Sequence, residues 1–127
     1  MQIAAFTIVV RDYDEALAFY VDKLGFTCVE DTDLGGGKRW VRVRPGDDGP
    51  CLLLARATSD AQRASVGNQT GGRVAIFFET TAFERLYERL TARGVRFVRA
   101  PVKETYGTVA VFEDLYGNSF DLIERAK

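Results

Sequence analysis

An internal repeat limits this chain to one kind of architecture. Residues in the first half correspond to residues 69 positions later, so that Leu17 matches Leu86, Gly25 matches Gly94 and Leu53 matches Leu122. The runs 52–57 and 121–126 agree at three of six positions without a gap. A repeat of this length indicates two copies of one supersecondary unit. With 127 residues, the chain is predicted to form one domain, at residues 2–125, by this duplication.

Each copy has the pattern of a strand, a helix and three further strands. In the first copy, at about 3–57, the apolar run 3–10 predicts a strand. Asp12 followed by Glu15 predicts the N-terminus of a helix, and Gly25 predicts its end. Three more strands are expected at 26–31, 40–44 and 51–55.

A glycine-rich connector, about 58–72, leads into the second copy, about 73–126. Within it, Ser59 and Gln62 predict a short helix at 60–64. Thr81 with Glu84 predicts the N-terminus of the second copy's helix, which is expected to end at Gly94. Further strands are expected at 73–78, 95–99, 108–113 and 119–124. The predicted fold is therefore α+β, with tandem βαβββ repeats and one helix on the outer face of each small sheet. Because sheets twist, the two are expected to curve around a shared hollow.

The last two strands are predicted to form a hairpin around Gly117-Asn118, a pair that tolerates positive φ angles. Asp121 follows, between Phe120 and Leu122. Since strand side chains alternate, its carboxylate points to the face opposite those two apolar residues. That face is either solvent or the lining of a cavity.

Composition excludes several classes of function. The chain contains no histidine, so Ser-His and Cys-His nucleophile schemes are absent, and any metal site would depend on Asp, Glu, Gln or Cys. A net charge of −1 gives no sign of nucleic-acid or membrane binding. Without a leader or a spanning apolar run, a cytoplasmic protein is expected. Cys28 and Cys51 show no metal-binding spacing and are interpreted as buried thiols.

Two stretches resemble a known superfamily. The opening run 8–26, IVVRDYDEALAFYVDKLGF, resembles the strand, helix and LGF stop that open the vicinal oxygen chelate superfamily. The closing run 113–122, EDLYGNSFDL, resembles its final hairpin motif. This superfamily includes glyoxalase I, the bleomycin-resistance proteins and the extradiol dioxygenases. The resemblance covers nearly the whole chain and implies the tandem βαβββ fold.

The resemblance also implies where a metal would be held. In the superfamily's enzymes, His, Gln or Glu side chains from the first and last strands of each unit bind a divalent ion. By gapless count, these positions fall on Ala5, on Val74 or Ala75, on Leu52 and on Asp121. A single carboxylate does not make a tight divalent site. We therefore expect neither a metal nor another cofactor.

Alternation along the run 40–44 suggests a ligand-binding surface instead. Trp40, Arg42 and Arg44 share one face of the predicted strand, and Val41 and Val43 share the other. The valines suit a packed core. An aromatic ring beside guanidinium groups suits a planar or anionic ligand. The alternative is a surface strand with solvated arginines.

Three further residues are candidates for ligand contact. Arg73 opens the second copy and could pair with Asp121 across the hollow. Tyr106 and Thr108 precede the last hairpin, a segment that borders the pocket mouth in the resembling fold. A simple turn tyrosine is the alternative for Tyr106.

These observations lead to one preferred function and two alternatives. The preferred function is metal-free binding of a small organic molecule, such as an antibiotic or other drug, by a homodimer. The first alternative is a lyase, isomerase or dioxygenase whose metal is held by acids. The second is a non-catalytic dimeric protein whose hollow is filled by its own side chains, for which Trp40, Phe77, Phe78 and Phe112 supply the bulk.

Overall fold

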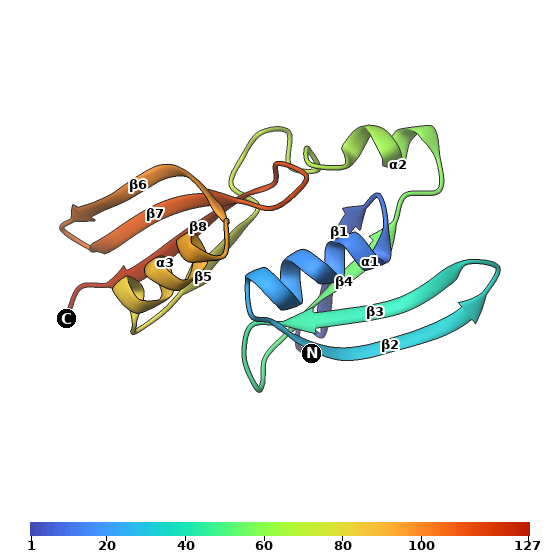
Figure 1. Cartoon of the computed structure of the whole chain (residues 1–127), viewed down its shortest axis with the longest axis horizontal. Helices are drawn as coiled ribbons and strands as arrows, with labels where there is room; N and C mark the ends of the chain where they lie inside the picture. Colours follow the sequence, from blue (N-terminus) through green and yellow to red (C-terminus); the bar gives the residue numbers. More distant parts are fainter. The chain divides into compact units, whose positions relative to one another are not determined.

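Figure 1 shows a computed structural model that describes all 127 residues. The chain divides into two units, Met1–Gly67 and Asn68–Lys127. Each unit contains one open, mixed sheet of four strands with a helix packed on one face. The structure therefore has the α+β fold of tandem βαβββ repeats that the sequence predicts.

The first unit contains β1 (Ala5–Val10), α1 (Tyr13–Leu17), η1 (Ala18–Lys23), β2 (Thr27–Gly35), β3 (Lys38–Arg44), β4 (Cys51–Arg56) and α2 (Asp60–Ser65). Its strands lie in the order β1-β4-β3-β2. The pair β1 and β4 is parallel, and the other neighbours are antiparallel.

The second unit contains β5 (Ile76–Glu79), α3 (Phe83–Ala92), β6 (Arg96–Glu104), β7 (Gly107–Glu113) and β8 (Ser119–Arg125). Its strand order, β5-β8-β7-β6, repeats that of the first unit, again with one parallel pair, β5 and β8. The duplication read from the sequence is thus present in the topology.

The first helix begins as predicted and then departs from regular α geometry. The Asp12 side chain accepts the Glu15 N–H at 2.9 Å and so caps the N-terminus. Beyond α1, η1 is a π-helical segment, in which the Leu24 N–H reaches the Phe19 carbonyl. The wider turn rotates the buried face, so that Phe19 is buried and Val21 is only half-buried.

One face of the first sheet lies under α1 and η1. The side chains that meet there are almost fully buried: Ile8, Val10, Val41, Val43, Leu52 and Leu54 from the strands, and Ala16 and Tyr20 from the helical segments. We call the opposite face of each sheet the helix-free face. Burial of this apolar surface is the main force that holds the unit together.

Aromatic rings dominate the core of the second unit. Phe120 lies 5.4 Å from Phe112 and 5.5 Å from Phe78, measured between ring centroids. Such edge-to-face and offset pairs stabilise a core beyond the area that they bury. Phe78 and Phe112 therefore pack in the core under α3. The other two candidates for filling a hollow are exposed, Phe77 to 63% and Trp40 to 40%.

The cap of α3 differs from the prediction. The N-cap position is Ala82, not Thr81, and its side chain offers no acceptor. The Phe83 N–H instead donates to the Glu124 carboxylate of β8 at 2.9 Å. A negative group at this end also opposes the helix dipole. The prediction failed because the cap comes from a strand 41 residues away.

The turn between β7 and β8 is built around Asp114. Its carboxylate accepts the N–H groups of Tyr116 and Asn118 and the side-chain amide of Asn118, at 2.8–2.9 Å. Asp114 and Asn118 are both buried. Gly117 alone takes a positive φ, of 96°, so the predicted turn is confirmed with glycine in the left-handed position.

Asp114→Ala is expected to lower the free energy of unfolding by about 3 kcal/mol, because it leaves buried donors without acceptors. Urea denaturation followed by circular dichroism measures the change. Asp47→Ala, in the exposed loop after β3, is the control and should change the free energy of unfolding by less than about 0.5 kcal/mol. Equal effects of the two substitutions would contradict the role given to Asp114.

Candidate functional site

The first sheet opens at one end, between two neighbouring strands. β3 pairs with β2 along its length, but with β4 only at Arg42–Leu53 and Val43–Leu52. In the second unit, β7 and β8 pair without interruption from Gly107–Arg125 to Glu113–Ser119. We call the opening between 38–41 of β3 and 54–56 of β4 the fork. It exposes strand edges that the second unit keeps paired.

A tyrosine from α1 provides a hydrogen-bond acceptor for one of the backbone groups exposed in the fork. The Tyr13 hydroxyl accepts the Arg39 N–H at 3.1 Å, although the two residues are 26 positions apart. The Tyr13 ring is buried and lies 5.2 Å from the Arg39 guanidinium and 5.7 Å from that of Arg56. Because a half-buried backbone N–H at a strand edge needs a hydrogen-bond acceptor, this hydroxyl takes the place of a strand partner.

The fork contains a pocket of about 390 Å³, which we call the fork pocket. Its lining combines aromatic, cationic and amide residues with apolar residues of β4: Tyr13, Gly36, Lys38, Arg39, Trp40, Leu53, Leu54, Ala55, Arg56, Thr58 and Gln62. The volume lies in the range of sites that bind small organic molecules.

Positive charge in the fork pocket has two sources that no acid neutralises. Arg39 is held by Asp14 at 2.8 Å and by Asp31 at 2.7 Å, and its guanidinium lowers the pKa of the Asp31 carboxyl below the ordinary value. Lys38 and Arg56 form no ion pair. No acidic residue lines the pocket. The pocket therefore favours an anion.

The Arg56 guanidinium is positioned by packing rather than by an acid. It lies over the Tyr13 ring, and the turn between β2 and β3 approaches it at Gly37. A Cβ on Gly37 would come within 3.3 Å of this guanidinium, and the φ of Gly37 is +82°. The positive φ favours glycine there, and the absence of a Cβ leaves the Arg56 guanidinium room beside the turn.

Trp40 and Arg42 lie on the helix-free face, as the alternation predicts. Trp40 lines the fork pocket with an exposed indole. Arg42 donates to Glu30 at 2.9 Å and contacts the Cys51 sulfur at 3.6 Å, so it is held beside the pocket without lining it. Cys28, interpreted from the sequence as buried, is exposed on the edge strand β2.

Asp121 lies on the helix-free face of the second sheet, opposite Val111 of β7 and Phe77 of β5. Partial burial raises the pKa of its carboxyl above the ordinary value of 3.8, and the charge of Arg99 counteracts part of that shift. The carboxylate therefore points away from α3, as the alternation predicts.

The predicted pairing of Arg73 with Asp121 is wrong. Arg73 is exposed and precedes β5, and no ion pair joins the two residues. Asp121 lies opposite Phe77 of β5, whereas Arg73 comes three residues before that strand begins. Arg99 on β6 is the cation that influences Asp121.

Tyr106 and Thr108 do not share a surface with Asp121. Tyr106 is exposed in the turn before β7, which agrees with the alternative that it is a simple turn tyrosine. Thr108 is opposite Glu124, on the face that α3 covers. The candidate residues are thus divided between the fork pocket and its border, the two faces of the second sheet, the turn before β7 and the segment before β5.

Sequence reasoning missed Tyr13, Lys38, Arg56 and Gln62, which line the fork pocket. Tyr13 follows the helix cap, and Arg56 ends a strand, so neither has a local signature of binding. The only sequence signal was the group of basic residues around Trp40. The rest of the pocket depends on a sheet opening that no local pattern encodes.

The profile of the Glyoxalase/Bleomycin resistance protein/Dioxygenase superfamily matches residues 2–122. The chain belongs to this superfamily. An uncharacterized protein of Shewanella frigidimarina is 52% identical over 124 residues, covering 96% of this chain and 92% of the relative. None of the helices combines the length and the apolar character needed to span a bilayer.

Solved structures of the superfamily fold are also similar to this chain. UcmS2 has a TM-score of 0.84 and 33% identity, with 97% of each chain covered. TnmS3, described as an antibiotic binding protein from Streptomyces sp. CB03234, has a TM-score of 0.81 and 25% identity, covering 99% of this chain and 97% of TnmS3.

The side chains at the superfamily's metal positions do not fit a divalent ion. Ala5 and Ala75 offer no ligand, and the Leu52 side chain is buried in the core beneath α1. Strand pairing makes Leu53, not Leu52, the residue of the first sheet that corresponds to Asp121, and it too is apolar. No group of three or more Cys, Asp or Glu residues could hold an ion.

Asp121→Asn is expected to change how stability depends on pH. The unfolded chain releases this proton at a lower pH than the folded protein does, because the folded pKa is raised. The stability of the wild type relative to the variant should therefore fall as the pH rises from about 3.8 through the raised pKa, and then level off. Urea titrations at several pH values measure this difference. A difference that is independent of pH, or of opposite sign, would contradict the raised pKa.

Proposed function

We propose that this protein binds a planar organic anion in the fork pocket and that binding needs no metal ion. The observation that carries the proposal is the presence of two cations without acidic partners, Lys38 and Arg56, beside the exposed Trp40 indole. A site of about 390 Å³ accommodates a ligand with two or three fused rings.

Each group has a distinct role in this binding mode. The planar body of the ligand stacks on Trp40, since aromatic faces pair favourably when offset. The fork-shaped guanidinium of Arg56 receives a carboxylate, and Lys38 adds a mobile point charge. Gln62 uses its side-chain oxygen to accept the N–H and hydroxyl of Thr58, so its amide N–H groups are oriented away from Thr58.

The relatives support a small organic ligand. TnmS3 is described as an antibiotic binding protein, and it shares the fold over almost the whole chain. Within this proposal the protein works as a homodimer in the cytoplasm. The exposed ring of Phe77 on the helix-free face supports the association.

A thermal-shift screen of planar acids, neutral compounds and amines tests the ligand class, since a ligand of the native state raises the melting temperature. The hits are expected to be enriched in acids. Trp40 is the only tryptophan, so quenching of its fluorescence then reports occupancy of the fork pocket directly. Stabilisation by amines alone, or by no compound, would contradict the proposal.

Arg56→Gln and Lys38→Gln should each weaken the best acid by about three- to tenfold, because each removes one unit charge from the pocket. Arg85→Gln in the second unit is the control, since it makes the same charge change at an exposed position without an ion pair. Affinity should be the same with and without a chelator. Equal weakening by all three substitutions, or loss of binding in chelator, would overturn the proposal.

A further inference from the structure

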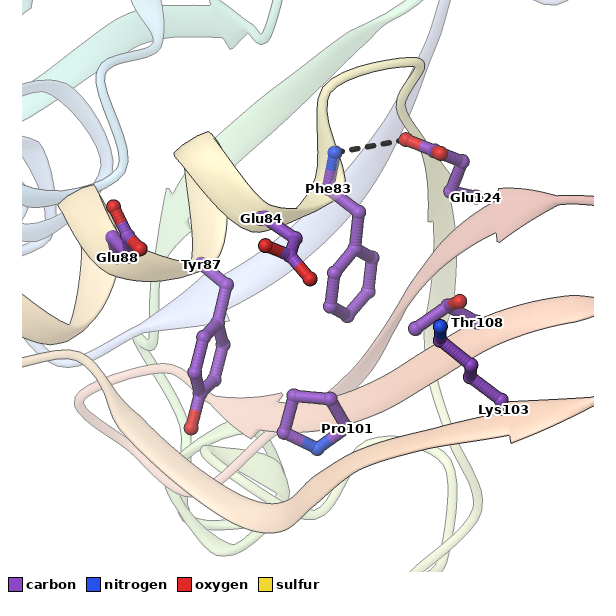
Figure 2. Close-up of a pocket in the computed structure, with 8 residues that line it drawn as sticks. All are labelled: Phe83, Glu84, Tyr87, Glu88, Pro101, Lys103, Thr108 and Glu124. Atoms are coloured by element: carbon purple, nitrogen blue, oxygen red, sulfur yellow. Dashed lines mark hydrogen bonds between the residues drawn. The ribbon is translucent and has the colours of Figure 1, made fainter.

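The second unit has a cleft of about 500 Å³ on the side of its sheet that α3 covers. Figure 2 shows that the first two turns of α3 form one wall and that strands β6 and β7 form the other. We call it the α3 cleft. It lies on the face opposite Asp121 and shares no residue with the fork pocket.

Two aromatic rings form the helix side of the α3 cleft. Phe83 and Tyr87 are nearly parallel, with an interplanar angle of 14° and centroids 6.2 Å apart. Tyr87 also makes an edge-to-face contact with Phe97, with ring centroids 4.6 Å apart. In Figure 2 both rings extend from the helix toward the strands, with Pro101 across from them. The cleft thus has a rigid apolar interior.

Acidic groups outnumber basic ones in this lining. Glu84 and Glu88 are four residues apart on α3, and neither forms an ion pair. Two like charges at this spacing repel each other. Glu124 adds a third carboxylate while it caps α3, and Lys103 is the only basic residue. The lining therefore carries an excess of two negative charges.

Figure 2 also shows how charge and apolar surface are combined. The Glu84 carboxylate lies between the Phe83 and Tyr87 side chains, on the side that faces the strands. A cation there would contact a carboxylate and the face of an aromatic ring together. Both interactions strengthen when water is excluded.

We propose that the α3 cleft binds a protonated organic amine with an apolar body. The ammonium group lies beside the Glu84 carboxylate, and the apolar body lies against Phe83, Tyr87 and Pro101. Nothing in this second site depends on the fork pocket or on its ligand. A single chain would then bind an organic anion in one unit and an organic cation in the other.

Calorimetric titration with three matched probes tests the charge preference. The probes are 2-phenylethylamine, which is protonated at neutral pH, the neutral 2-phenylethanol, and the anionic 3-phenylpropanoate. The amine is expected to bind at least about fivefold more tightly than the alcohol, and the acid more weakly than the alcohol at this site. Equal affinity for amine and alcohol would overturn the role of the carboxylates.

Amide chemical shifts and tryptophan fluorescence locate the bound amine. Shifts are expected at residues 83–88, 102–103 and 108, and the emission of Trp40 should stay unchanged because it lies in the other unit. Shifts confined to residues 38–40 and 53–58, or quenching of Trp40, would place the amine in the fork pocket and overturn the assignment. The absence of any binding at 10 mM amine, roughly the weakest useful affinity, would overturn it as well.

Substitutions separate the charge from the aromatic contribution. Glu84→Gln should weaken the amine by about three- to tenfold, and Tyr87→Leu, which keeps an apolar wall but removes the ring, by about two- to fivefold. Asp22→Asn makes the same charge change at an exposed position in the first unit and should leave the affinity unchanged. An equal loss with Asp22→Asn and Glu84→Gln would show a nonspecific charge effect and overturn the proposal. Thermal unfolding of each variant verifies that it is folded.

Discussion

The hydrogen bond from the Arg39 N–H to the Tyr13 hydroxyl decides how the first unit can bind a ligand. A strand that leaves its neighbour exposes polar backbone groups, and these must find partners or be solvated. Tyr13 supplies one such partner from the start of α1 and places its ring under two guanidinium groups. The same side chain thus stabilises the opening of the sheet and positions Arg56, so the pocket belongs to the folded framework and is largely preformed.

The two copies of the module keep one topology while their surfaces differ. The first carries a basic pocket where β3 and β4 separate, and the second carries an acidic cleft in a sheet whose β7 and β8 pair without interruption. Core positions are tightly constrained because close-packed interiors tolerate few changes of shape. Charged residues at the margins, such as Lys38 in one copy and Glu84 in the other, escape that constraint. Duplication therefore supplies one scaffold on which two opposite electrostatic environments are built.

The sequence predicted the fold well because its signals are local or periodic. The Asp12 cap, the glycine turn at Gly117 and the alternation of Trp40 with Val41 depend on neighbouring residues. Alternation also placed Asp121 on the face away from the helix. The strand correspondence failed by one residue, since Leu53 rather than Leu52 is equivalent to Asp121, and a shift of one residue reverses the face. The Glu124 cap and the fork were not predictable, because each joins segments distant in sequence.

Glu124 connects the architecture of the second unit to what its cleft will accept. One oxygen of this carboxylate accepts the Phe83 N–H and so caps the N-terminus of α3. The same side chain lines the α3 cleft. A ligand that drew the Glu124 carboxylate away from the Phe83 N–H would remove this cap and destabilise the helix by about 1 kcal/mol. A ligand that leaves this hydrogen bond intact avoids that cost. The helix terminus therefore favours cationic ligands that pair with Glu84 and leave Glu124 on the Phe83 N–H.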